Sequence, residues 1–266
     1  MPHDDLLDIA RTIALEAAEL AVTRRREGVS VVATKSNAVD IVTQVDRDVE
    51  TLIRGRLSEL RPGDGFYGEE SGAERGTTGL TWVVDPIDGT VNFLYGLPNY
   101  GVSIAVVDGD PDPLTWTALA GCVANPETGD LYAASAGGGA SLNDQPISVL
   151  AAPPLSQALV ATGFVYDVAT RVHQGEVAAR LLSEVRDIRR MGSCALDLCA
   201  VASGRIDAYY ESTLSPWDHA AGVLIAQEAG SLVKGWGEKN AGRELILAGA
   251  PETVVALEAL LAEYGY

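Results

Sequence analysis

One long stretch of the chain carries no positive charge. Between Arg75 and Arg171 there are 95 residues without Lys, Arg or His, and this stretch contains nine acidic residues, including Asp85 and Asp88. A buried carboxylate needs a proton, water or a metal cation to be tolerated, and hard divalent cations prefer oxygen ligands. Any fold of this chain must therefore leave these acids in water or gather some of them around a cation.

The size and charge of the chain set further limits. Its 266 residues, 47% of them hydrophobic, are enough for one large domain or two small ones. The net charge of −18 argues against nucleic acid or an anionic membrane as the main partner, because both require a basic surface. The three cysteines lack the spacing of a zinc site or a disulfide framework, and the acidic N-terminus does not resemble a signal peptide. We therefore expect a cytoplasmic protein.

The hydrophobic pattern predicts a mixed α/β (α+β) fold. Apolar residues at steps of three and four predict two helices at the start of the chain, and short β-like runs separated by turn residues follow. The predicted helices are 4–26, 44–60, 173–185, 193–202, 216–229 and 251–263, and the predicted strands are 66–68, 81–84, 101–107, 115–124, 131–134, 159–162, 208–211, 231–233 and 245–248. Two helices, a mostly antiparallel sheet and a smaller α/β half indicate a layered architecture.

The most informative motif lies at the end of the strand predicted at 81–84. This apolar run ends in Asp85, and Asp88 follows three residues later, so that two carboxylates and the carbonyl of Ile87 can converge on one cation. Gly89 and Thr90 then begin a segment that can form a helical turn, whose exposed amides would favour an anion such as phosphate. The alternative is an ordinary turn in which the acids supply only turn chemistry.

Further acids occur at other predicted element ends. Glu69 and Glu70 follow a short strand, where adjacent glutamates repel each other unless water or a cation separates them. Asp46 follows Thr43 by three residues and Asp218 follows Ser215 by three residues, which is the spacing of a helix capping box. The alternatives are an exposed acidic loop for the glutamates and simple helix capping for the two aspartates.

Several motifs in a fixed order make the chain resemble the inositol monophosphatase family, the lithium-sensitive, magnesium-dependent phosphatases of the fructose-1,6-bisphosphatase-like superfamily. The resemblance implies a layered α-β-α-β-α sugar-phosphatase fold and a homodimer. The residues that carry it are Lys35, Ser36, Asp40 and Asp46, Gly68-Glu69-Glu70-Ser71, the segment 82–93, the segment 207–211, and Trp217 and Asp218 with 220–222 and 228–230.

The resemblance also implies a site with two to three magnesium ions. By correspondence with the family, Glu69, Asp85 and the carbonyl of Ile87 hold the first ion, and Asp85, Asp88 and Asp218 hold the second. A third, weaker ion lies near Glu69. A junction expected at Pro153 and Pro154 would place most of these ligands in an N-terminal α+β subdomain (1–150), and the last ligand and the substrate contacts in a C-terminal α/β subdomain (151–266).

Phosphoryl transfer requires an activated water, and no basic residue is available near the motif to neutralise phosphate. We expect metal ions to supply the positive charge. We also expect the Thr90 hydroxyl to accept a hydrogen bond from the water and to pass this polarisation on to Asp46. Asp46, Glu69 and Thr90 are therefore the candidate catalytic residues. The amides of Gly89 and Thr90 would bind phosphate oxygen, and the resemblance implies that the segment Gly192-Ser193-Cys194 and Glu211 contact the alcohol portion of the substrate. The candidate substrate-binding residues are therefore Asp88, Gly89, Thr90, Gly192, Ser193, Cys194, Glu211 and Asp218.

These inferences predict magnesium-dependent hydrolysis of a small phosphorylated polyol, favouring myo-inositol monophosphate. Histidinol phosphate, fructose 1,6-bisphosphate and 3′-phosphoadenosine phosphate are alternative substrates, and a non-catalytic regulatory protein is the alternative from another class. The segment Tyr209-Tyr210-Glu211 and the short chain favour inositol phosphate. Arg189 and Arg190 are the nearest candidates for binding a second phosphate.

Overall fold

The computed structural model describes residues 3–28, 31–34 and 41–266. Two long helices, α1 (Asp4–Glu27) and α2 (Gln44–Leu60), open the fold, and each buries one apolar face. Acids in the first turn of α1 and arginines in its last turn complement the helix dipole. The short strands β1 (Val31–Thr34) and β2 (Ile41–Thr43) pair antiparallel between these two helices in the sequence.

The larger sheet has eight strands in the order β10-β9-β8-β7-β6-β5-β3-β4. All neighbours in it are antiparallel except β3 and β5, which are parallel. Its strands are β3 (Gly65–Gly68), β4 (Gly72–Glu74), β5 (Leu80–Asp88), β6 (Gly101–Asp108), β7 (Thr117–Ala124), β8 (Leu131–Ser135), β9 (Gly139–Leu142) and β10 (Gln145–Ile147). The short helix α3 (Thr90–Tyr95) follows β5 directly.

The smaller sheet has five strands in the order β12-β11-β13-β15-β14. From Leu155 onwards, the elements in chain order are the 3₁₀ turn η1 (Leu155–Gln157), β11 (Leu159–Thr162), α4 (Val168–Leu181), β12 (Asp187–Arg189), α5 (Cys194–Ala202), β13 (Ala208–Glu211), α6 (Pro216–Glu228), β14 (Leu232–Lys234), β15 (Ile246–Gly249) and α7 (Pro251–Tyr264). The pairs β11–β12 and β11–β13 are parallel, and β15 is antiparallel to both of its neighbours.

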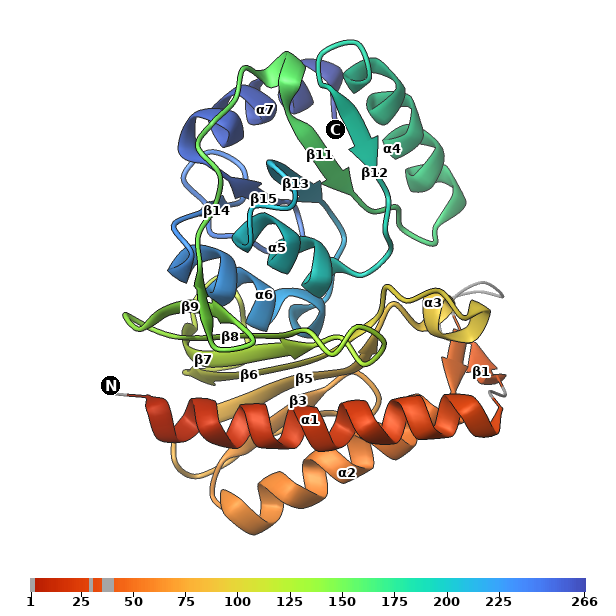
Figure 1. The fold of residues 1–266 in the computed structure, drawn as a ribbon, viewed down its shortest axis with the longest axis vertical. Coiled ribbons are helices and arrows are strands. Elements are labelled where there is room, and N and C mark those ends of the chain that lie inside the picture. Colours follow the sequence, from red (N-terminus) through yellow and green to blue (C-terminus); the bar gives the residue numbers. More distant parts are fainter. Residues whose placement is uncertain (1–2, 29–30, 35–40) are drawn as a thin grey trace.

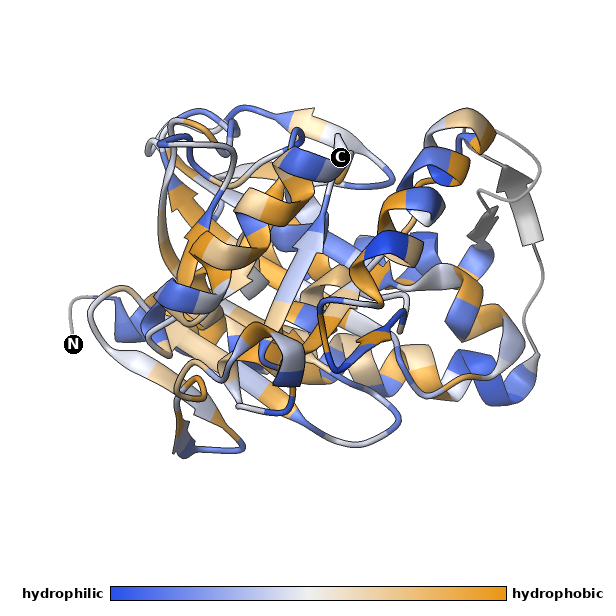
Figure 2. Cartoon of the chain, turned by 90° about the horizontal axis from the view of Figure 1, so that it is seen from above, coloured by the Kyte–Doolittle hydropathy of each residue, from blue (hydrophilic) through white to orange (hydrophobic). Residues whose placement is uncertain are grey.

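Helices and sheets alternate as five layers (Figure 1). Helices α1 and α2 cover one face of the larger sheet, α5 and α6 lie between the two sheets, and α4 and α7 cover the outer face of the smaller sheet. Figure 2 shows hydrophobic and hydrophilic residues alternating along the helices, as expected when one face packs against a sheet. The predicted layered α-β-α-β-α fold is confirmed. Within the described residues, none of the helices is long and apolar enough to cross a membrane.

One predicted helix begins earlier than expected. The sequence pattern placed it at 173–185, whereas α4 runs from Val168 to Leu181. The reason is Asp167, whose carboxylate accepts a hydrogen bond from the Thr170 amide at 2.9 Å and caps the helix. The short strands β1, β2, β4, β9, β10 and β12 were not predicted. The division into two subdomains stays a prediction.

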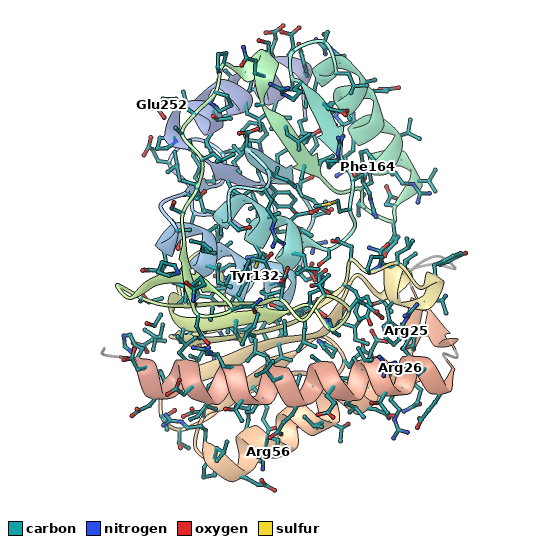
Figure 3. All side chains as sticks on the ribbon, viewed as in Figure 1. Arg25, Arg26, Arg56, Tyr132, Phe164 and Glu252 are labelled. Carbon is teal, nitrogen blue, oxygen red and sulfur yellow. The ribbon has the colours of Figure 1, made fainter. Side chains whose placement is uncertain are left out.

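Arg25 connects the end of α1 to the segment after β5. Its Nε donates to the carbonyl of Phe93 in α3 at 3.0 Å, and its Nη1 lies 2.7 Å from Oε1 of Glu127. Figure 3 shows Arg25 at the end of α1 that lies next to α3. The arginine at this helix end therefore holds α3 in place in addition to its effect on the helix dipole.

The close packing of α5 against α6 gives a first prediction. A Cβ atom at Gly222 of α6 would lie 2.8 Å from Cδ1 of Leu198 and 2.9 Å from its Cβ, whereas a Cβ atom at Gly175 of α4 would meet nothing within 4 Å. We expect Gly222→Ala to lower the free energy of unfolding by about 1–3 kcal/mol through overpacking. Gly175→Ala should raise it by about 0.5–1 kcal/mol, because alanine favours helix. Urea denaturation measures both values, and a gain of stability in both variants would contradict the close packing.

Candidate active site

A bulge in β5 brings two acids to the same face of the larger sheet. Between Asp85 and Asp88 the strand advances three residues while β6 advances only two, from Ser103 to Gly101. Side chains alternate between faces in a regular strand, so the extra residue moves Asp88 to the face that Asp85 occupies. The packing agrees, because Ile87 belongs to the core under α1 and α2, while Asp88 faces α5.

The start of α3 brings a hydroxyl next to a buried acid. Gly89 has a φ of +94°, and a Cβ atom there would lie 3.0 Å from the carbonyls of Asn99 and Gly192, so only glycine fits this position. Oγ1 of Thr90 lies 3.1 Å from Oδ1 of Asp46 and 3.1 Å from the carbonyl of Ile87. The Thr90 hydroxyl can therefore donate to either of these two acceptors, and its oxygen can still accept a hydrogen bond.

Asp46 is held by the start of its own helix. Its Oδ2 accepts a hydrogen bond from the Thr43 amide at 2.9 Å and a second from the Thr43 hydroxyl, which completes the predicted capping box. Burial raises the pKa of Asp46 to about 6, offset in part by the Thr43 hydrogen bonds. Its other oxygen, Oδ1, is the one that faces Thr90.

Asp88 is tied to the C-terminal half of the chain. Its Oδ2 accepts hydrogen bonds from the Ser193 hydroxyl at 2.6 Å and from the Ala195 amide at 2.7 Å. Ser193 is also the N-cap of α5, where its hydroxyl oxygen lies 3.3 Å from the Leu196 amide. Burial raises the pKa of Asp88 to about 6, while the bonds from Ser193 and Ala195 act in the opposite direction.

Asp218 serves as a cap and belongs to the same acidic cluster. In the capping box at the start of α6, the Ser215 amide donates to its Oδ2 at 2.7 Å, and Pro216 occupies the first helical position. Burial and the neighbouring carboxyl groups of Glu69 and Asp88 raise its pKa well above the usual range. Asp218 therefore caps α6 and also belongs to the acidic cluster, two roles that the sequence left as alternatives.

Asp85 lies at the centre of the cluster. It is 2% exposed, and its Oδ1 accepts a hydrogen bond from the Ile87 amide at 3.0 Å. Burial, followed by the nearby carboxyl group of Glu69, raises the pKa of Asp85 well above its usual range. Of the two adjacent glutamates, Glu69 lines the cavity with Asp85, whereas the carboxylate of Glu70 lies 3.9 Å from Nε of Arg47.

The chemistry of this cluster fits a divalent cation. The acid donors of Glu69, Asp85, Asp88 and Asp218 are all carboxylate oxygens, and their mutual proximity opposes ionisation, which a cation among them would relieve. Among the described residues, however, no three acidic, cysteine or histidine side chains are already arranged to hold a metal ion. The acids share one pocket without forming a preformed cage. Lys35, Ser36 and Asp40 lie outside the described residues.

The pocket itself is a cavity of about 520 Å³ between the two halves of the chain. The larger sheet contributes Glu69, Asp85, Ile87 carbonyl and the start of α3, and the smaller half contributes Gly192, Ser193, Cys194, Glu211 and Asp218. Of the predicted site residues only Asp46 does not line it, and Asp46 contacts it through Thr90.

Glu211 closes the pocket on the side of the smaller sheet. The Tyr209 hydroxyl donates to its Oε2 at 2.7 Å, and burial raises the pKa of Glu211 to about 7. A Cβ atom at Gly163 would overlap the Glu211 carboxylate, so glycine is required after β11. The family resemblance implied that Glu211 contacts the substrate. In the structure, Glu211 lines the same cavity as the acids.

Several lining residues were missed by the sequence analysis. The loop after β11, with Phe164 and Tyr166, and a turn before β15 that contains Arg243 both line the cavity. Phe164 is labelled in Figure 3. The only sequence signal for this loop was a strand end followed by glycine, and Arg243 had none, because it approaches the site through pairing between distant strands.

Comparison with known proteins gives a consistent result. A sequence model described as the inositol monophosphatase family matches residues 3–264. The inositol-1-monophosphatase of Mycobacterium leprae (strain TN) is 43% identical over 98% of this chain and 94% of its own length. The solved structure of Mycobacterium tuberculosis SuhB has a TM-score of 0.82 and 42% identity, covering 98% of this chain and 97% of that one. A Vibrio cholerae relative called Nus factor SuhB is 36% identical over 86% of this chain and 84% of its own.

The bond from Ser193 to Asp88 gives a second prediction. Ser193→Ala removes both the cap of α5 and a donor to a buried carboxylate, so the free energy of unfolding should fall by about 1–2 kcal/mol. Ser203→Ala at the other end of α5 removes a hydroxyl that donates to the Cys199 and Ala200 carbonyls of its own helix and should change the free energy of unfolding by less than about 0.5 kcal/mol. Thermal or urea denaturation compares the two, and equal effects would show that the bond to Asp88 contributes nothing.

Proposed function

The chain belongs to the inositol monophosphatase family, and we propose that it hydrolyses myo-inositol monophosphate to myo-inositol and phosphate. Its class is that of a phosphoric monoester hydrolase. The single observation that supports this most is the pocket in which four carboxyl groups, from Glu69, Asp85, Asp88 and Asp218, lie together with Thr90. Relatives named inositol-1-monophosphatase at 43–45% identity support the same substrate.

Enzymes of this family generally depend on magnesium, and we propose the following ligands here. Glu69, Asp85 and the carbonyl of Ile87 would hold one ion, and Asp85 with Asp88 and Asp218 would hold another, with a third, weaker ion near Glu69. When bound, magnesium supplies the positive charge that offsets the phosphate oxygens and acidifies the attacking water. Support for this assignment comes from the all-oxygen donor set and from the absence of basic residues between Arg75 and Arg171.

Thr90 and Asp46 would position the attacking water. The Thr90 hydroxyl can donate its proton to Oδ1 of Asp46, which leaves an oxygen lone pair to accept a hydrogen bond from the water. Asp46 keeps this orientation because Thr43 holds its other oxygen. Glu69, which lines the same pocket, would accept a second hydrogen bond from this water and so fix its direction towards phosphorus.

The two halves of the pocket would bind different parts of the substrate. The amides of Gly89 and Thr90 would bind phosphate oxygens, close to the acids of β5 and α6. The alcohol portion would meet the segment from Gly192 to Cys194 and the Glu211 carboxylate. Because Tyr209 already donates to Oε2 of Glu211, Oε1 is the oxygen that would accept a hydrogen bond from a substrate hydroxyl.

A regulatory function is the second candidate, because some relatives carry the name Nus factor SuhB. We place catalysis first, since Asp46, Thr90 and all the acids of the proposed metal site are present. A homodimer, a cytoplasmic location and inhibition by lithium also belong to this proposal, by analogy with the family. Sedimentation measures the first of these, and a monomer at micromolar concentration would contradict it.

The substrate assignment is tested by phosphate release from a panel of esters. We expect inositol 1-phosphate to be hydrolysed with a higher kcat/KM than histidinol phosphate, fructose 1,6-bisphosphate or 3′-phosphoadenosine phosphate. Removing magnesium with EDTA should abolish the release, and adding magnesium back should restore it. Turnover that survives EDTA, or a preference for another ester, would contradict the proposal.

Asp218→Asn tests the proposed metal ligands. Asparagine can still accept the hydrogen bond from the Ser215 amide, so α6 should keep its cap and the melting temperature should change little. Phosphate release with magnesium should fall by about a hundredfold or more, because a negative charge is lost from the cluster. Asp110→Asn, at an exposed carboxylate 3.2 Å from Arg75, is the matched control and should leave turnover unchanged. Normal turnover in Asp218→Asn would refute the site.

A further inference from the structure

The side chain of Asn92 connects two backbone segments that are far apart in the sequence. Asn92 lies in α3, two residues after Thr90, and is 6% exposed. Its Nδ2 donates to the carbonyl of Asn99 at 2.7 Å and to the carbonyl of Met191, 99 residues further along the chain, at 2.7 Å. Both hydrogens of the amide are therefore used, and the side chain joins α3 to the segment that follows β12.

The chemistry of the two partners fixes the orientation of this amide. An asparagine side chain has two donor hydrogens on its nitrogen and an oxygen that only accepts. The carbonyls of Asn99 and Met191 are both acceptors, so a rotated amide would bring Oδ1 against two other oxygens. Only the nitrogen of Asn92 can therefore face this pair, and an ionised aspartate of the same size could donate neither bond.

Close packing of the backbone places these bonds beside the cavity. A Cβ atom at Gly192 would lie 3.0 Å from Nδ2 of Asn92, and a Cβ atom at Gly89 would lie 3.0 Å from the carbonyls of Asn99 and Gly192. Gly89 and Gly192 both line the cavity, whereas Asn92 is not among the described residues that line it. Asn92 would therefore act on a bound substrate only through the neighbours that it holds.

The two segments that Asn92 joins belong to the two ends of the proposed substrate site. Gly89 and Thr90 begin α3, where the amides would bind phosphate oxygens, and the segment from Gly192 to Cys194 would meet the alcohol portion. Hydrolysis requires both portions to be held in one alignment with the attacking water, and a small displacement costs much of the rate. The separation of these two ends is therefore the quantity that the Asn92 bonds can control.

We infer that Asn92 is a positioning residue that fixes the phosphate-binding start of α3 relative to the alcohol-binding segment after β12. The inference rests on the proposed phosphatase function and deepens it, because it assigns the alignment of the two ends of the substrate to one side chain. The hydrogen bonds to Asp88 described above join β5 to the start of α5. Asn92 adds a connection from α3 to the backbone just before α5.

Asn92→Ala tests the inference by removing both donors. We expect kcat for inositol 1-phosphate to fall about tenfold or more while KM changes by less than about threefold, because the substrate still binds but is misaligned for attack. Inorganic phosphate occupies only the phosphate end, so its inhibition constant should stay within about twofold. The variant should remain folded, since Arg25 still holds α3 through the Phe93 carbonyl, and circular dichroism at the assay temperature checks this.

Further variants separate the hydrogen bonds from the loss of side-chain volume and from added charge. Asn92→Asp keeps the volume and loses the donors, so kcat should fall at least as far as in Asn92→Ala. Asn99→Ala and Asn99→Asp are the matched controls, because the Asn99 side chain donates a single, longer bond of 3.3 Å to the same Met191 carbonyl. Both controls should lower kcat by less than about threefold. If Asn92→Ala does not fold, the comparison of the two aspartate variants decides the question.

The remaining outcomes overturn the inference. A wild-type kcat in Asn92→Asp would mean that the two bonds do not control the reaction. An equal loss of kcat and of phosphate affinity in Asn92→Ala would mean that Asn92 supports α3 itself rather than its separation from the alcohol side. Equal losses in the Asn92 and Asn99 variants would mean that Asn92 has no special role. A wild-type protein that releases no phosphate from inositol 1-phosphate with magnesium would overturn the proposed function as well, whereas normal wild-type turnover with unchanged variants would overturn the positioning role alone.

Discussion

The structure depends on burying several carboxyl groups close together. Three of these acids, Asp85, Asp88 and Asp218, each accept a hydrogen bond from a backbone amide, which offsets part of the cost of burial. Ile87 donates to Asp85, Ala195 to Asp88, and Ser215 to Asp218. Such bonds stabilise the charged form and fix the direction of the side chain. The fold itself therefore orients the carboxyl groups of these three acids beside the cavity that they line.

The two helices between the sheets, α5 and α6, position two of the acids. The start of α5 binds Asp88 through Ser193 and Ala195, and the start of α6 carries Asp218. Their close contact at Gly222 fixes one helix start relative to the other. The relative position of Asp88 and Asp218 in the cavity is thus set by helix packing. Residues far from the cavity, such as Arg25 at the end of α1, contribute by holding α3 against β5.

Local patterns in the sequence predicted a layered mixed α/β fold and acids at the ends of its elements, whereas the five-layer order and the convergence of the acids came from the family resemblance. Asp85 and Asp88 ended an apolar strand, and Asp46 and Asp218 stood at capping spacing, so both groups could be recognised within a few residues. What could not be predicted depends on long-range contacts. The start of α4 depended on the cap at Asp167. Arg243 reaches the cavity through strand pairing. Arg189 and Arg190 were indistinguishable in the sequence, yet one pairs with Asp187 and the other lines the cavity. The roles of the site residues stay proposals.

The single extra residue in β5 has a consequence for how such a chain can evolve. The bulge between Asp85 and Asp88 sets which face of the sheet every later side chain of the strand occupies. A substitution within it changes one group, but an insertion or deletion of one residue would reverse the faces of Asp88 and Ile87 and move the start of α3. Descendants of this sequence can therefore vary in length at their surface loops, while the number of residues from Asp85 to Thr90 is fixed.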